Sequence, residues 1–157
     1  MSRFIWALLA AALLAACGRT GGESPGQAPA LPDLTATSPW TLRFTQSGGI
    51  MGMMRTMEIQ SSGQATITDQ RTKKTATVKL TQADLSQLRA AATQSSYTPV
   101  SEPTGCADCF VYRVEIDSGT GAPFAAQMDD VSLEKSGMST LVNYLRALME
   151  TQLKSAS

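Results

Sequence analysis

The sequence predicts an α+β domain, in which an antiparallel β-sheet carries two main helices packed on one face. Short runs of alternating apolar and polar residues recur between Trp40 and Met128, and short turns between the early runs favour hairpins over crossovers. A capped helical segment begins at Thr81, and a continuous apolar stripe from Met138 to Leu153 closes the chain. Strands and helices that share one core in this way are typical of the α+β class.

The expected strands are defined by period-two alternation of apolar residues. In the first, Leu42 and Phe44 share one face; in the fifth, Phe110, Tyr112 and Val114 do. The strands are expected at Trp40 to Gln46, Met53 to Gln60, Gln64 to Asp69, Ala76 to Leu80, Phe110 to Asp117 and Pro123 to Met128.

The two expected helices have different signatures. Thr81 followed by Asp84 is close to a capping box, and Leu80 with Leu85 forms a hydrophobic staple across the helix start. This helix should end before Tyr97, where Thr98 and Pro99 follow. The closing helix is expected from its apolar stripe, which consists of Met138, Leu141, Val142, Leu145, Leu148, Met149 and Leu153.

The N-terminus resembles a bacterial lipoprotein leader. Arg3 supplies a positive charge, and the apolar run from Phe4 to Ala16 is shorter than the roughly 20 residues that a membrane-spanning helix needs. The run ends in Leu14-Ala15-Ala16-Cys17, which resembles a lipobox. The resemblance implies removal of residues 1–16 and attachment of diacylglycerol to Cys17. An unmodified secretory signal with a chance cysteine is the alternative.

The leader predicts a three-part chain in a bacterial cell envelope. Residues 1–16 are the signal peptide, and residues 17–38 are a lipidated N-terminus and flexible tether, since they are rich in Gly, Pro, Ser and Thr. Residues 39–157 are the α+β domain. Acyl chains would hold the protein on the extracytoplasmic face of a membrane, the outer membrane if the cell has two, and a tether of about 20 residues spans roughly 25 Å.

Composition excludes several kinds of chemistry. The 13 basic and 13 acidic residues balance, which gives no argument for nucleic acid or for electrostatic membrane binding. The chain has no histidine, so Ser-His-Asp and Cys-His catalytic arrangements are absent. Glu115, Asp117, Asp129 and Asp130 remain as candidates for acid–base work, but adjacent aspartates at a strand end are typical of a turn. We expect no enzyme activity, no cofactor and no metal ion.

Cys106 and Cys109 form the sequence Cys-Ala-Asp-Cys immediately before a predicted strand. In an exported protein the two thiols are expected to form a structural disulfide with each other. A free or metal-binding pair and a redox-active pair are the alternatives, although two sulfur ligands are too few for zinc and redox CxxC motifs sit at helix N-termini.

Four methionines lie between positions 51 and 57, namely Met51, Met53, Met54 and Met57. Thioether clusters bind Cu(I), so an extracytoplasmic copper protein is one interpretation. In a strand, however, Met54 would lie on the face opposite to the other three. The second interpretation is that the methionines line the core or the hairpin, because methionine fills irregular apolar space.

The predicted domain resembles the emfourin family over roughly residues 41–153. Emfourins are small protein inhibitors of protealysin, a thermolysin-like zinc metalloprotease, so the resemblance implies a protein-binding module. The lipobox, the tether and the Cys106–Cys109 pair lie outside the family pattern, and no inhibitory contact residue can be placed on this chain. The resemblance rests on Phe44, Gly48-Gly49-Ile50, Gly52, Arg55, Ile59, the Leu85–Leu88 helix, Phe110-x-Tyr112-x-Val114, Asp129-Asp130 and the leucine-rich closing helix.

The sequence therefore predicts a membrane-anchored lipoprotein with a non-catalytic protein-binding domain. Binding is expected through the Gly48–Met54 and Tyr97–Cys109 loops. The most specific version of this hypothesis is inhibition of a secreted thermolysin-like metalloprotease. Another envelope protein is the alternative partner, while Cu(I) binding and a purely structural envelope role are the alternative functions. The candidate contact residues are Ile50, Met51, Met53 and Met54.

Overall fold

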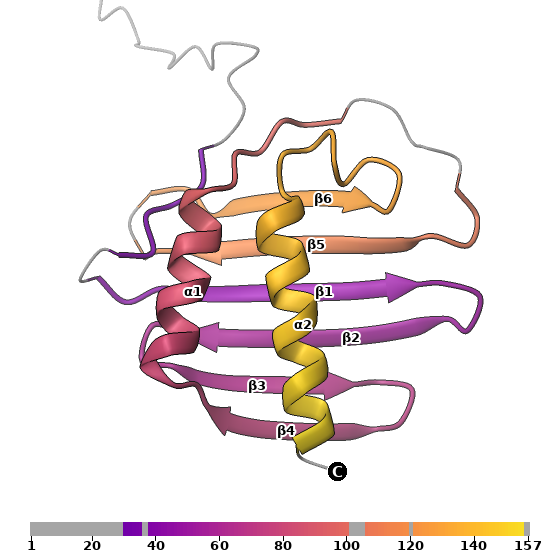
Figure 1. Cartoon of the computed structure of the whole chain (residues 1–157), viewed down its shortest axis with the longest axis horizontal. Coiled ribbons are helices and arrows are strands. Elements are labelled where there is room, and N and C mark those ends of the chain that lie inside the picture. The colour runs from indigo at the N-terminus through magenta and orange to yellow at the C-terminus, as the bar shows by residue number, and fades with distance from the viewer. Residues whose placement is uncertain (1–29, 36–37, 101–105, 120, 156–157) are drawn as a thin grey trace, which may run out of the picture.

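Six antiparallel strands form one sheet, and two helices lie against one of its faces (Figure 1). The computed structural model describes residues 30–35, 38–100, 106–119 and 121–155. The α+β class and the antiparallel sheet that the sequence predicts are confirmed.

The sheet is built outward from its first strand, in the order β4-β3-β2-β1-β5-β6. Every neighbouring pair is antiparallel, and β1 occupies a central position between β2 and β5. The strands are β1 (Thr41–Gly48), β2 (Met53–Gln60), β3 (Gln64–Asp69), β4 (Lys74–Lys79), β5 (Phe110–Asp117) and β6 (Phe124–Asp129).

The register of β1 defines the two ends of the sheet. At one end Gly48 lies between Met53 of β2 and Phe110 of β5, and at the other end Thr41 lies between Gln60 and Asp117. The β1–β2 and β3–β4 turns and the start of β5 all lie at the Gly48 end, on the right of Figure 1.

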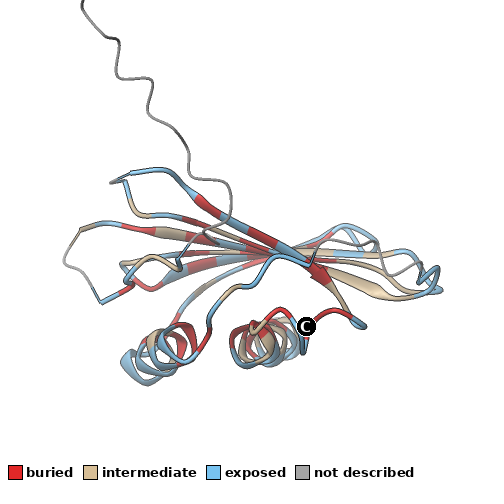
Figure 2. Cartoon of the chain, turned by 90° about the horizontal axis from the view of Figure 1, so that it is seen from above, coloured by how far each residue is buried: buried red, intermediate tan, exposed pale blue. Residues whose placement is uncertain are grey.

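Both helices cover the same face of the sheet (Figure 2). Helix α1 (Gln82–Thr93) begins with the expected capping box between Thr81 and Asp84, and Leu80 and Leu85 are both buried. Helix α2 (Ser139–Ser155) buries Leu141, Val142, Leu145, Leu148 and Met149. The core lies between the helices and alternate strand residues, of which the largest are Leu42, Phe44, Met57, Ile59, Ile67, Tyr112 and Ile116.

Neither α1 nor α2 covers the other face of the sheet, which is polar. Ion pairs join Arg43 to Glu58 between β1 and β2, and Arg113 to Glu115 within β5, each at 2.8 Å. These side chains are at least one-third exposed, so solvent screens each pair and it adds little stability.

Contacts with the core begin before residue 39, within the segment predicted to be a tether. Leu34 is buried in the core and Leu31 packs against it. The Leu34 carbonyl accepts hydrogen bonds from Trp40 Nε1 at 3.0 Å and from Arg89 Nε at 3.1 Å. Two leucines among polar and proline residues therefore dock a segment whose overall composition predicts only a tether.

The predicted signal peptide and the predicted lipid site at Cys17 lie outside the described residues. Within the described part of the chain, neither helix has the length and apolar character that crossing a bilayer requires.

Candidate interaction surface at one end of the sheet

Three connecting segments meet at the Gly48 end of the sheet. They are the β1–β2 turn at residues 49–52, the β3–β4 turn at residues 70–73 and the disulfide loop at residues 106–109. The sheet order places them side by side. The β1–β2 turn leads into β2, the β3–β4 turn starts from the neighbouring strand β3, and the disulfide loop leads into β5, which is the other neighbour of β1. We call this region the loop end.

The β1–β2 turn presents the most exposed large apolar side chains of the described structure. Ile50 is 87% exposed and Met51 67%, while Met54 at the start of β2 is 40% exposed. The turn is closed by a hydrogen bond from the Gly52 amide to the Gly49 carbonyl at 2.9 Å. We call Ile50, Met51 and Met54 the apolar tip.

The methionines of this region do not point in one direction. Met57 is fully buried in the core, and Met53 is half-buried on the same face of β2. Met54 lies on the opposite face, as strand alternation requires, and Met51 lies in the turn rather than in the strand. The separation of Met54 from the other strand methionines follows the period-two prediction.

The tip rests on the disulfide loop through the two glycines at its base. The Gly49 amide donates a hydrogen bond to the Cys109 carbonyl at 3.1 Å. A Cβ atom on Gly48 would lie 2.4 Å from that carbonyl oxygen, and one on Gly49 would lie 2.8 Å from the ring of Phe110. Both glycines also have positive φ angles, +100° and +69°. Side chains are therefore excluded from the hairpin base by contact and by backbone conformation.

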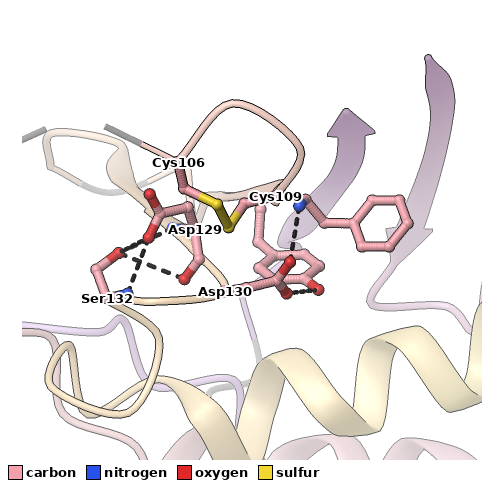
Figure 3. Close-up of a disulfide and its surroundings, with 7 residues drawn as sticks. Cys106, Cys109, Asp129, Asp130 and Ser132 are labelled. Carbon is pink, nitrogen blue, oxygen red and sulfur yellow. Dashed lines mark hydrogen bonds between the residues drawn. A yellow bond between two sulfur atoms is a disulfide. The ribbon is translucent and has the colours of Figure 1, made fainter. Parts of the chain in front are cut away.

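A disulfide joins Cys106 to Cys109, with Cα atoms 5.5 Å apart (Figure 3). Cys106 is exposed and Cys109 is half-buried. The bond closes a loop of only four residues directly before β5, so it constrains the segment that receives the Gly49 amide.

On the other side of Phe110, Asp130 closes the loop end against β5. The Asp130 carboxylate accepts from the Phe110 amide at 2.8 Å and from the Tyr112 hydroxyl at 2.6 Å (Figure 3). Its neighbour Asp129 accepts from the amide and hydroxyl of Ser132, at 2.8 and 2.7 Å. These carboxylates organise a turn, which is the role that adjacent aspartates at a strand end are expected to have.

Tyr112 connects this turn to the core. Its side chain is fully buried, stacks on Phe44 with ring centroids 6.3 Å apart, and lies 5.2 Å below the guanidinium of Arg146. Burial raises the pKa of the Tyr112 phenol most strongly, and the hydrogen bond to Asp130 adds to this, while the Arg146 charge opposes it. The phenol therefore stays protonated well above its ordinary pKa of 10.0.

The β3–β4 turn is fixed by an ion pair whose carboxylate, that of Asp69, is buried. Arg55 Nε donates to Asp69 at 2.8 Å, and the second Asp69 oxygen accepts from the Arg71 and Thr72 amides at 3.0 Å. Burial raises the Asp69 pKa, but the Arg55 and Thr72 hydrogen bonds and the Arg55 charge together set it below the ordinary 3.8. The Gln70 amide also donates to the Met54 carbonyl at 2.9 Å, which joins this turn to the apolar tip.

The second expected binding loop, Tyr97–Cys109, does not form one surface. Tyr97 packs edge-on against Phe124, with centroids 5.8 Å apart, and Phe124 begins β6 at the end of the sheet away from Gly48. Among the described residues of this loop, those from Cys106 onward lie at the loop end, and residues 101–105 lie outside the described residues. The structure thus brings together the hairpin and the disulfide loop, but leaves Tyr97 apart from them.

The four carboxylates that the sequence offers for acid–base chemistry are dispersed. Glu115 pairs with Arg113 on the open face, and Asp117 accepts from the Gly119 amide at 2.8 Å at the far end of the sheet. The Arg55–Asp69 and Tyr112–Asp130 pairs were not expected. Two features of the sequence could have indicated these pairs. Arg55 and Asp69 are charged residues at inward-facing positions of β2 and β3, and Asp129-Asp130 lies at the end of β6.

No protein-family model matches the chain, and a search of curated proteins finds no match either. The resemblance to the emfourin family drawn from the sequence therefore stays a prediction.

Proposed function

We propose that this chain is a non-catalytic protein-binding module that engages its partner through the apolar tip. The observation that carries the proposal is the exposure of Ile50, Met51 and Met54 together at the end of one hairpin. Burying an exposed aliphatic side chain stabilises a complex by about 1.5–3 kcal/mol, so these three residues are the strongest source of apolar binding energy at this end.

The hairpin is pre-organised for this role. Its base is hydrogen-bonded to Cys109 on one side, and Met54 is hydrogen-bonded to Gln70 on the other. A loop that is already fixed loses less conformational freedom on binding, which raises affinity without added contacts. Unbranched methionine side chains on a fixed backbone then adapt to the wall of a groove.

The sharpest form of the proposal is inhibition of a thermolysin-like metalloprotease. It is supported by the resemblance of the glycine-rich hairpin and the strand and helix pattern to the emfourin family. Another envelope protein is the alternative partner. Lipid attachment at Cys17 belongs to the proposal and would hold the domain at a membrane surface in the cell envelope.

Cu(I) binding through the methionines is less well supported than protein binding. Met57 is fully buried among core residues, and Met53 and Met54 face opposite sides of β2. A thioether site needs its sulfur atoms to converge on one point. The arrangement instead offers Met51 and Met54 as separate exposed side chains beside Ile50.

The test changes the tip and leaves the core intact. Ile50, Met51 and Met54 are replaced together with serine, and inhibition of thermolysin-like proteases from the same organism is measured. We expect the inhibition constant to rise at least about tenfold, since each lost apolar contact costs on the order of 1 kcal/mol or more. The control replaces Val100 with serine; this residue is 37% exposed and lies outside the three segments of the loop end.

Two results would contradict the proposal. One is a tip variant that inhibits or binds as tightly as the unchanged chain. The other is stoichiometric Cu(I) binding that disappears in the tip variant, without any protease inhibition. The anchor is tested separately: Cys17→Ser should abolish membrane association or processing, and a mature N-terminus without added lipid in mass spectrometry would refute it.

A further inference from the structure

The fold separates the charges of a chain whose net charge is zero. Residues 64–79 and 150–155, at the β4 side of the sheet, contain five basic and two acidic residues. The described residues between 106 and 135, at the β5–β6 side, contain two basic and six acidic residues. The sheet order places these groups at opposite edges, so the domain has a positive edge and a negative edge (Figure 1).

The positive edge is made by three elements. Arg71 and Lys73 lie in the β3–β4 turn, Lys74 and Lys79 lie at the two ends of β4, and Lys154 lies in the last turn of α2. All five residues are exposed. Lys154 joins the others because the C-terminal end of α2 reaches β4, where it lines a hollow of about 290 Å³ with Thr72 and Lys74. The basic residues thus follow the whole length of the outer strand.

The two acidic residues of this region offset at most one of these five positive charges. Asp69 is buried and already neutralised by Arg55 at 2.8 Å, which leaves Glu150 as the acidic residue near the α2 end of the hollow. Lys79 Nζ donates to the Ser62 carbonyl, a neutral group, so that contact removes none of its charge.

We propose that the β4 edge docks onto a membrane surface that contains anionic phospholipid. Clusters of four to eight basic residues close to a membrane are typical of binding to anionic lipid headgroups. Four of the five basic residues are lysines, which act as flexible point charges, whereas fixed carboxylates of a protein partner favour the planar guanidinium of arginine. A fluid headgroup layer also accepts cations spread over a turn, a strand and a helix end.

The negative edge gives the docked domain an orientation. Asp108, Asp117, Asp130 and Glu134 are exposed at the β5–β6 side. Six strands about 4.8 Å apart hold this edge roughly 24 Å from β4, which is beyond the screening length of about 8 Å at physiological salt. The anionic surface therefore attracts one edge and scarcely repels the other. The β3–β4 turn belongs to both the loop end and the docked edge, whereas the apolar tip lies on the β1–β2 turn. The tip then points along the membrane plane and stays open to a protein partner.

The inference goes beyond protein binding, and it uses the proposed lipid anchor only to bring the domain close to the membrane. The lysines of the chain can report which edge contacts the membrane. Four of the five are at the β4 edge, and the fifth, Lys135, is at the opposite side. The mature chain is placed on vesicles of phosphatidylcholine, alone or with about 30% phosphatidylglycerol. Lysine acetylation rates are then read by mass spectrometry.

We expect anionic vesicles to slow acetylation of Lys73, Lys79 and Lys154 about threefold or more, with Lys135 unchanged, and about 0.5 M salt to remove the effect. The variant Arg71→Gln, Lys73→Asn, Lys154→Gln should lose the protection of Lys79. Asparagine is chosen at position 73 because Lys73 has a positive φ of 55°. The control variant Arg43→Gln, Arg113→Gln, Lys135→Gln loses the same charge elsewhere and should keep the protection.

Several results would overturn the inference. One is that lysine acetylation proceeds at equal rates on the two kinds of vesicle, and another is that the control variant loses as much protection of Lys79 as the variant changed at the β4 edge. A third is that protection rises with protein concentration in the absence of lipid, which would indicate pairing with the negative edge of a second copy. If the mass of the chain shows no lipid on Cys17, co-sedimentation with the same vesicles replaces the acetylation readout, and failure to sediment with anionic vesicles refutes docking. The tip variant should dock normally, so docking and partner binding fail independently.

Discussion

The Gly49 amide donates its hydrogen bond to the Cys109 carbonyl at 3.1 Å, so the tip hairpin and the disulfide loop share one backbone junction. Gly48 lies in the same junction, with its Cα facing that carbonyl so closely that no side chain fits. The exposed apolar residues are therefore held by a contact between two segments about 60 residues apart in the chain.

The first prediction concerns Gly48. Gly48→Ala should lower the free energy of unfolding by about 2 kcal/mol or more, because Cβ would meet the Cys109 oxygen at 2.4 Å and φ is +100°. Denaturant unfolding measures the change. Gly52→Ala is the matched control: its φ is +58°, but no atom lies within 4 Å of the added Cβ, so only backbone strain of about 1 kcal/mol applies. Equal costs at both positions would contradict the junction.

The second prediction concerns the disulfide. Reducing Cys106–Cys109 should destabilise the domain by only about 2 kcal/mol, because the closed loop is short. The effect should be local: the Gly49 amide should exchange with solvent faster after reduction, whereas the Leu85 amide in α1 should keep its protection. Hydrogen exchange on oxidised and reduced protein measures both. Unchanged exchange at Gly49 would show that the disulfide does not hold the hairpin.

The third prediction concerns acid stability. The folded pKa of Asp69 lies below its ordinary 3.8, so the stability from its ionised form is present above that pH and is lost as the pH falls below it. Asp69→Asn should cost about 2 kcal/mol at neutral pH, because three hydrogen bonds to the carboxylate are weakened or lost. It should also flatten the fall in stability as the pH drops below the ordinary pKa of 3.8. Unfolding free energies from neutral to acidic pH measure both.

Glu58→Gln is the comparison for this prediction. Its partner Arg43 is 57% exposed, and Glu58 itself is 39% exposed. The loss should be no more than about 0.5 kcal/mol. If the two substitutions cost the same, the buried position of the Arg55–Asp69 pair would not account for its effect.

The fourth prediction concerns alkaline stability. The folded pKa of Tyr112 lies above its ordinary 10.0, so its contribution is complete below pH 10 and is lost as the pH rises above it. Tyr112→Phe should remove part of the alkaline fall in stability and cost about 1 kcal/mol at neutral pH through the lost bond to Asp130. Burial and the Asp84 charge also raise the Tyr144 pKa, so Tyr144→Phe should remove a second part. No change in alkaline slope in either variant would refute this assignment.

Local signals were sufficient for most elements of the fold. The strands Met53–Gln60, Gln64–Asp69 and Phe110–Asp117 have the bounds that alternation predicts, because most apolar residues of each strand lie on one face. The capping box fixes the start of α1. At Lys74–Lys79 the strand begins two residues earlier than predicted, because Lys74 and Thr75 complete the pairing with β3 despite having no apolar side chain.

Contacts between distant segments could not be predicted. The burial of Leu34 depends on Trp40 and Arg89, which pack around its carbonyl only in the folded domain. The Arg55–Asp69 pair depends on the β2–β3 register, and the Gly49–Cys109 contact depends on β5 returning to β1. The sequence alone singles out the tip residues. The separation of the apolar tip from Tyr97 and its junction with Cys109 are properties of the assembled sheet.

The central position of β1 has a consequence for the order in which the chain folds. Strands β1 to β4 are joined by consecutive short hairpins, whereas β5 pairs with β1 only after a chain excursion of about 60 residues. Closing so long a loop costs more entropy and slows the contacts that depend on it. We expect the β1–β4 meander and α1 to be structured in the transition state, with β5, β6 and α2 added late, so that Ile67→Val slows folding while Val114→Ala mainly speeds unfolding. The part of the domain that folds first, β1 to β4 with α1, then carries the tip residues. The part that folds last, which includes β5, completes the junction that fixes them.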